Sequence, residues 1–249
     1  MMEKKYEITN ESKVFRVYDR YVRVFRIRSL KYFGDVKKGD LGGWIESEDN
    51  LSYDGNCWIY DDGIVCNHAR VDRNAKIRDN ALVEVNAVIT DSAKVYGHAS
   101  VSYNAWVSSN AEVYDYAKIY GNCTVSGKSK VYGNAFITDE VQLYNTEVTN
   151  NIQLSGAIKI FNGYIKHYDN YLTHGPIGSR HDMVSFYRGI DNEIHASTGC
   201  FEGTLKQFED AVNKTHKDNE KYRTDYLNLV KFIKENWRTK NGTEEIRDN

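Results

Sequence analysis

The chain has almost no proline and no long apolar run. Pro176 is the only proline in 249 residues. No segment is apolar over the length that a bilayer requires, so no membrane span is expected. The first six residues lack the apolar stretch of a secretory leader. The net charge of −2 gives no overall attraction to nucleic acid or to an acidic membrane surface.

Cysteine is also scarce. The four cysteines have neither metal-site nor redox spacing, so no metal site is expected. Cys57 and Cys123 lie at inward positions of a six-residue repeat and are expected to serve as small core residues. Free, buried thiols indicate a reducing compartment, and we predict a cytoplasmic protein.

A strict six-residue period runs through the middle of the chain. From Ile59 to Leu143 every sixth residue is aliphatic, fifteen times in succession, and the residue two positions earlier is alanine in ten of the fifteen. Neither the 3.6-residue period of a helix nor the alternation of a simple strand produces a period of six. A fixed repeat of this kind predicts a solenoid.

The physical role of each position in the hexad follows from strand geometry. Residues two apart in an extended segment face the same side, so the aliphatic residue and the alanine before it point inward. Two and three positions after each aliphatic residue the chain turns a corner. These corners, such as Asp79-Asn80 and Gly121-Asn122, contain residues that tolerate positive φ. Three sides close a coil of eighteen residues. The repeat continues after a one-residue slip to Ile160, which predicts eighteen hexads, or six coils.

The flanks of the repeat have a different character. Segment 13–28 alternates apolar and basic residues, which predicts two strands with one solvent-exposed face. We assign residues 1–56 to an N-terminal cap. Its basic residues are interpreted as a solvated face, with binding of phosphate or an acidic protein as the alternative. The solenoid is assigned to residues 57–165.

Residues 166–249 are predicted to form a small α+β C-terminal domain. Segments 183–188 and 193–197 predict a hairpin. Thr204 and Gln207 form a capping-box pattern at the start of one helix. A second helix with one apolar face is expected over residues 219–237.

The repeat resembles that of hexapeptide-repeat, left-handed parallel β-helix proteins. The left hand is implied by that resemblance and not by the residues. Segments 39–46, 175–180 and 199–204 look like segments of such proteins encoded by phages and prophages. The predicted fold is therefore mainly β: a left-handed parallel β-helix of about six coils with a β-rich N-terminal cap and an α+β C-terminal domain. The resemblance implies a phage accessory protein.

A more distant similarity is to hexapeptide acyltransferases. Such enzymes use a histidine base, a protruding loop and acyl-CoA bound between the coils of a trimer. This chain departs from that pattern, because no long insertion interrupts the hexads. The only coil histidines, His68 and His98, lie at corners without an evident orienting partner. We therefore predict no catalytic residue and no cofactor.

One face of the predicted coils combines cations with aromatic rings. Stacking every eighteen residues brings together Tyr60, Lys76, Arg78, Lys94, Tyr96, Tyr114, Lys130 and Tyr132. The first interpretation is an aromatic ladder that stabilises the solenoid. The alternatives are a binding surface for a partner protein, and one for a nucleotide or single-stranded nucleic acid, since cations and stacking rings suit both.

A second candidate site lies in the loop Gly175–Asp182. Its glycines could direct backbone amides at an anion, with Arg180 and His181 adding positive charge. A Cys–His nucleophile pair is a further hypothesis, since Cys200 follows several histidines in the sequence. An ordinary polar hairpin is the favoured interpretation.

The predicted function is non-catalytic binding. A phage accessory or counter-defence factor would engage a host protein in the host cytoplasm, or would sequester a nucleotide signal. A homo-oligomer, dimer or trimer, is expected. The alternatives are a hexapeptide-type acyltransferase and a structural or assembly module.

Overall fold

The computed structural model describes residues 3–17 and 19–237. The chain divides into two compact units, Met1–Lys166 and His167–Asn249, which are described separately. The end of the predicted C-terminal domain, 238–249, lies outside the described residues.

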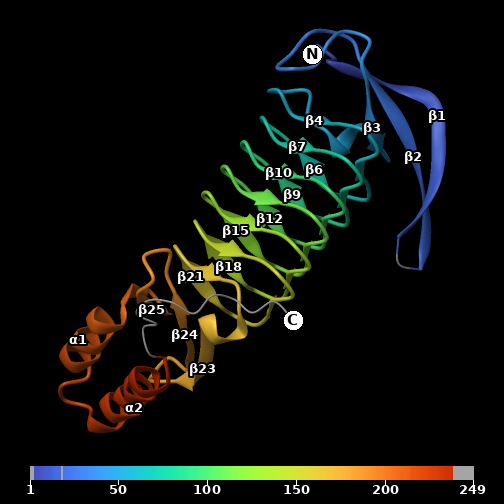
Figure 1. Ribbon diagram of the computed structural model, residues 1–249. Helices are drawn as coiled ribbons and strands as arrows, with labels where there is room; N and C mark the ends of the chain where they lie inside the picture. Colours follow the sequence, from blue (N-terminus) through green and yellow to red (C-terminus); the bar gives the residue numbers. More distant parts are fainter. Residues whose placement is uncertain (1–2, 18, 238–249) are drawn as a thin grey trace, which may run out of the picture. The chain divides into compact units, whose positions relative to one another are not determined.

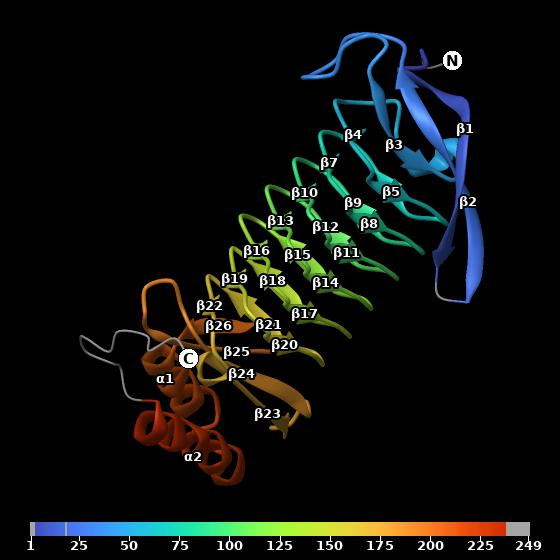
Figure 2. The same ribbon diagram turned by 45° about the vertical axis from the view of Figure 1, so that its right-hand side comes forward.

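The first unit is a parallel β-solenoid of about seven turns, in which short strands stack in three rows (Figures 1 and 2). The first face consists of β3 (Leu41–Ile45), β5 (Ile64–Val65), β8 (Leu82–Val83), β11 (Ser100–Val101), β14 (Lys118–Ile119), β17 (Phe136–Ile137) and β20 (Gln153–Leu154). The second face consists of β4 (Trp58–Ile59), β7 (Lys76–Ile77), β10 (Lys94–Val95), β13 (Glu112–Val113), β16 (Lys130–Val131), β19 (Glu147–Val148) and β22 (Tyr164–Ile165). The third face consists of β6 (Arg70–Val71), β9 (Val88–Ile89), β12 (Trp106–Val107), β15 (Thr124–Ser126), β18 (Gln142–Tyr144) and β21 (Lys159–Phe161).

The predicted solenoid is confirmed, with one turn more than the six expected. Ile45 pairs with Val65 and Leu51 pairs with Val71, both in parallel, so the first turn begins before the regular hexads. At the other end Ile165 pairs with Val148 and adds a strand after Ile160. Ile45 and Leu51 are six residues apart and were expected as a possible start of the first coil, but the count of eighteen hexads left them out because eight residues separate Leu51 from Ile59. The count also left out Ile165, which follows Ile160 by five residues.

The interior is filled as the hexad pattern predicts. The aliphatic residues and the alanines two positions before them are fully buried, as are Cys57 and Cys123. The residue two positions after each aliphatic residue has positive φ. Many of these corner residues are aspartates whose carboxylates accept a backbone N–H from the next turn. Asp79 accepts from Gly97 at 2.8 Å and Asp115 accepts from Gly133 at 3.1 Å. The corners are thus linked by side chain as well as by backbone.

An antiparallel hairpin covers the outside of the first turns. It consists of β1 (Tyr6–Val17) and β2 (Arg20–Ser29), and β2 also pairs with β3. Val17, Val22 and Val24 pack against Trp44 and Ile64, with Leu82 beside them. The hairpin thus covers outward apolar side chains of the first turns, and it lies beside those turns in Figure 1.

The N-terminal segment also closes the end of the stack. Trp58, the largest fully buried side chain, has 1% of its surface exposed and packs edge-on against Tyr6 and Phe33. Beside it the buried Lys5 ammonium donates to three backbone carbonyls, including that of Cys57 at 2.9 Å. Open solenoid ends expose backbone groups that need partners. Here a lysine provides them, although burial lowers its pKa.

The second unit is an antiparallel sheet with two helices. Its strands are β23 (Tyr171–Ile177), β24 (Asp182–Arg188), β25 (Ile194–Thr198) and β26 (Phe201–Thr204), and its helices are α1 (Leu205–Thr215) and α2 (Glu220–Asn236). The predicted hairpin, both helices and the Thr204 capping box are confirmed. The predicted loop Gly175–Asp182 is shorter than expected, because β23 continues to Ile177. Short 3₁₀ turns occur at Glu48–Asn50 and Tyr168–Asn170. Neither α1 nor α2, the α-helices of the described segments, has the length and apolar character of a membrane-crossing helix.

Candidate functional site

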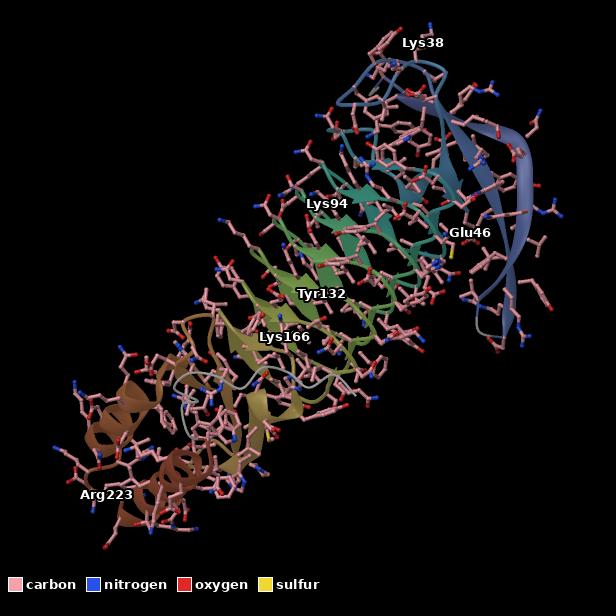
Figure 3. All side chains as sticks on the ribbon, in the orientation of Figure 1. Lys38, Glu46, Lys94, Tyr132, Lys166 and Arg223 are labelled. Carbon is pink, nitrogen blue, oxygen red and sulfur yellow. The ribbon has the colours of Figure 1, made fainter. Side chains whose placement is uncertain are left out.

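The predicted aromatic ladder forms on the second face of the solenoid. The rings of Tyr96, Tyr114 and Tyr132 stack with centroids 4.8 Å apart and planes 2° from parallel. This distance equals the spacing between neighbouring strands, so the rings repeat in step with the backbone. Lys94, Tyr132 and Lys166, all on this face, follow one another along the stack in Figure 3. The eighteen-residue stacking that was expected to bring these residues together is therefore present.

The cations of this face are held by acids of the same chain. Lys76 and Arg78 form ion pairs with Asp35 at 2.7 and 3.3 Å, and both lie over the Tyr60 ring. Lys94 pairs with Glu112 at 2.8 Å. The Tyr132 hydroxyl donates to Glu147 at 2.6 Å. Of these three acids only Glu112 belongs to the regular hexads.

The additional acids come from outside the regular repeat. Asp35 belongs to the N-terminal cap, and Glu147 follows the one-residue slip of the hexads. Lys130 is exposed, and it is the one predicted cation of this face for which the described residues provide no acid partner. An anionic ligand would have to displace Asp35 or Glu112 to reach the remaining cations. The second face is thus better suited to stabilising the solenoid than to attracting a polyanion.

The paired state of Asp35 predicts a pH dependence of stability. Hydrogen bonds from Lys76 and from the Tyr60 hydroxyl lower the pKa of Asp35 to about 2, from an ordinary value of 3.8. A carboxyl with a lowered pKa in the folded state contributes stability that is complete above its unfolded pKa and is lost as the pH falls toward about 2. The melting temperature of the wild type should therefore fall more between pH 4 and pH 2 than that of Asp35→Asn.

The effect is modest, because the Asp35 side chain is half exposed and solvent screens the pair. Asp49→Asn, at another exposed carboxyl of the cap, is the matched control and should retain the wild-type slope. Equal slopes in all three proteins would contradict the ion pairs of Asp35.

Aromatic side chains lie on all three faces of the middle turns of the solenoid, and three of the larger ones are exposed. Tyr103, Trp106 and Tyr116 expose 45%, 46% and 58% of their surfaces. Trp106 lies on the third face, and Tyr103 and Tyr116 lie at corners. We call this group the aromatic belt; its members are Tyr96, His98, Tyr103, Trp106, Tyr114, Tyr116, Tyr120, Tyr132 and Phe136.

Neighbouring members of the aromatic belt contact one another. His98 stacks on Tyr116 at 5.0 Å, and Tyr120 lies between Tyr103 at 6.1 Å and Phe136 at 5.6 Å. The rings thus form three contacting groups: the ladder of the second face, the pair at the adjoining corner, and the trio on and beside the first face. The sequence predicted the second-face rings Tyr96, Tyr114 and Tyr132 as a ladder. It did not predict the stacking of Tyr103 and Tyr116, because the hexad pattern relates corner residues to backbone conformation and not to one another.

The loop residues predicted as an anion site are separated by the structure. Arg180 lines a pocket in the second unit, formed by two turns of the sheet and by both helices. His181, at positive φ, does not line that pocket. Cys200 lines the pocket, but none of the four histidines that precede it in this unit does. His195 instead bonds Asp191 at 2.9 Å, and the histidine that reaches the pocket is His216.

Catalytic features are sparse in the described residues of the solenoid. His98 is stacked on Tyr116, and no carboxylate there forms a hydrogen bond with His68 or His98. The strands follow one another at hexad spacing from β4 to β18, with no protruding loop between them. Across residues 3–17 and 19–237 no group of three or more His, Cys, Asp or Glu could hold a metal ion.

Comparison with known proteins yields one partial similarity. No family model matches the chain. A segment of 85 residues, 32% of this chain, is 32% identical to a protein of Escherichia coli (strain K12) that carries the name "Uncharacterized acetyltransferase YdcK". The match spans about a quarter (26%) of that relative's length. The similarity agrees with a hexapeptide-type solenoid.

Proposed function

We propose that the protein is a non-catalytic binding protein and that its solenoid recognises a partner protein through the aromatic belt. The observation that supports this most directly is the exposure of Tyr103, Trp106 and Tyr116 on a rigid stack. Large rings in water are costly unless something covers them, and clusters of them mark interaction surfaces. Tyrosine and tryptophan are also the residues most enriched among the side chains that dominate binding energy.

The surroundings of the belt favour a protein partner over a polyanion. Serine, threonine and asparagine lie between the rings, for example Ser100, Asn104 and Thr124. Tyrosine with small polar residues is the composition of protein-binding paratopes, in which rings supply contact area at low entropic cost. Because the β-solenoid holds these side chains on closely paired turns, little ordering should be needed on binding. The nucleotide alternative has less support, because Lys76, Arg78 and Lys94 are paired within the chain.

The partner class follows from the resemblance of the flanking segments to phage and prophage proteins. A protein of the infected bacterial cell, such as a component of a defence system, is the partner that we propose. The protein would then act in the host cytoplasm by occluding that partner.

The test is affinity purification from bacterial lysate with quantitative mass spectrometry. The wild type is compared with a Tyr103→Ser, Trp106→Ser, Tyr116→Ser triple variant. A partner that uses the belt should be lost by about a hundredfold or more, since residues of this kind contribute about 2 kcal/mol or more each. The matched control is Tyr21→Ser with Tyr32→Ser, which removes two rings exposed by 74% and 75% outside the belt. If the wild type and the triple variant recover equal amounts of the partner, the belt does not contribute to binding.

The second candidate function is acyl transfer from acyl-CoA, which the name of the E. coli relative favours. Calorimetric titration with acetyl-CoA discriminates between the two proposals. Heat of binding at millimolar acetyl-CoA, together with acetyl transfer to an amine or hydroxyl acceptor, would support the enzyme. If no heat of acetyl-CoA binding is measured, the acyltransferase proposal is excluded and the proposal of a non-catalytic binding protein stands.

A further inference from the structure

The second unit contains a pocket of about 300 Å³ at one end of its sheet. The turn between β23 and β24 and the turn between β25 and β26 form one side. The last turn of α1 and Tyr226 of α2 form the other. This volume lies at the lower limit of typical ligand pockets, which suits a small metabolite.

Two opposite charges, Arg180 and Asp182, reach this pocket from the turn between β23 and β24, next to Gly199 in the turn between β25 and β26. A Cβ atom added to Gly199 would lie 3.3 Å from Asp182 Oδ2 and 3.9 Å from Arg180 Nη1, so both groups lie over this glycine. Gly199 has φ +54°, which lets the backbone approach them. No ion pair joins the two charges. In the described part of the chain, neither side chain forms a hydrogen bond or ion pair. Their capacity for charge-assisted hydrogen bonds remains available to a ligand.

The surroundings of Asp182 favour a positively charged group. The last turn of α1 lines the pocket with Thr215 and His216, so the negative end of the helix dipole faces it. The His216 ring stacks on Tyr226 at 5.4 Å, which adds two aromatic faces. Burial, and secondarily the charge of Asp182, raises the pKa of Tyr226, so its hydroxyl stays protonated near that carboxylate.

The Tyr226 hydroxyl is itself placed by a glycine. A Cβ atom at Gly178, where φ is +72°, would lie 2.2 Å from this oxygen, so no other residue fits there without displacing the ring. Within the described residues the hydroxyl forms no hydrogen bond. Phe201, Phe208, Ala211 and Val212 give the pocket an apolar wall, and Ser179 and Thr198 also line it.

We propose that this pocket binds a small zwitterion of the α-amino acid class. Arg180 receives the carboxylate, Asp182 receives the ammonium group, and the apolar wall receives the side chain. A simple anion such as phosphate would face the carboxylate of Asp182, and a simple amine would face the guanidinium of Arg180. Only a ligand that carries both charges close together satisfies both residues.

Cys200 provides a direct readout of occupancy. It lines the pocket and is the exposed cysteine, whereas Cys57, Cys66 and Cys123 are buried. N-ethylmaleimide should therefore modify the native protein at Cys200 alone, and mass spectrometry can follow the rate. L-Leucine, L-methionine, L-phenylalanine and L-glutamate are the probes. At least one should slow the reaction in a saturable manner, which gives a Kd.

Variants and analogues separate the two charges. Arg180→Gln and Asp182→Asn should each weaken the protecting amino acid by about 10- to 100-fold, the loss expected for one charge-assisted partner. Asp210→Asn, on the exposed side of α1, is the matched control and should bind normally. Removing the ligand's ammonium group by N-acetylation, or its carboxylate by amidation, should weaken binding to a similar extent.

Two measurements control for folding: the rate of Cys200 modification without ligand and the circular dichroism spectrum. In each variant both should match those of the wild type. Failure of every amino acid to protect Cys200 would overturn the proposal. Protection by inorganic phosphate or by the N-acetylated analogue at equal concentration would also overturn it, in favour of an anion site centred on Arg180.

Discussion

Replacing Trp58 by alanine should lower the free energy of unfolding of the solenoid unit by about 3–5 kcal/mol, the range for truncating a large buried aromatic residue. Trp58 projects outward from the first strand of the second face, but the N-terminal segment covers all except 1% of its surface. Its loss would open a cavity between Tyr6 and Phe33 and would loosen the segment that places Lys5 over the end of the stack.

The matched control is Trp106→Ala, the same substitution on a neighbouring face of the same solenoid. Trp106 is 46% exposed, so its removal should change stability by no more than about 0.5 kcal/mol. Urea unfolding monitored by circular dichroism measures both variants. Similar losses in the two proteins would mean that the end of the stack is not sealed by Trp58. A stable Trp106→Ala variant would also show that the belt can be altered without unfolding the protein.

The architecture of the solenoid was predictable because it depends on a local rule repeated many times. Each hexad places an aliphatic residue inward, an alanine beside it and a residue tolerant of positive φ at the corner. A rule of this kind needs no knowledge of distant contacts. The spacing departs from six between Leu51 and Ile59 and between Ile160 and Ile165. The number of turns was therefore underestimated by one, although the middle of the stack was correct.

The features that bear on function were less predictable, because they depend on contacts between segments without a shared period. Asp35 reaches Tyr60, Lys76 and Arg78 only through the path of the cap, and nothing in the repeat marks it as a partner. The pocket of the second unit combines Asp182, Gly199 and Tyr226, which are far apart in sequence. Arg180 was identified by its charge, but its role depends on residues that only the folded sheet brings together.

Replacing Ala105 by leucine should strongly destabilise the middle of the stack. Ala105 is fully buried in the inward position two residues before Val107, with Ala87 and Cys123 at the equivalent positions one turn away on either side. Turns are spaced by about 4.8 Å, so a larger side chain cannot move along the axis without meeting the next turn. Overpacking of this kind costs about 1–3 kcal/mol or more. Because each turn contacts only its neighbours, the strain should lower the cooperativity of unfolding as well as its midpoint.

Thr124→Leu adds an apolar side chain of the same size one turn away, at an outward and half-buried position of the same face. It should change stability by no more than about 0.5 kcal/mol, because an outward side chain can extend into solvent. Both variants introduce a leucine on the third face, at an inward position in Ala105→Leu and at an outward position in Thr124→Leu. Equal stability of the two proteins in urea unfolding would contradict the inward and outward assignment of the hexad. Since the aromatic belt is defined by that same assignment, its members would then no longer share the outer surface of the coils.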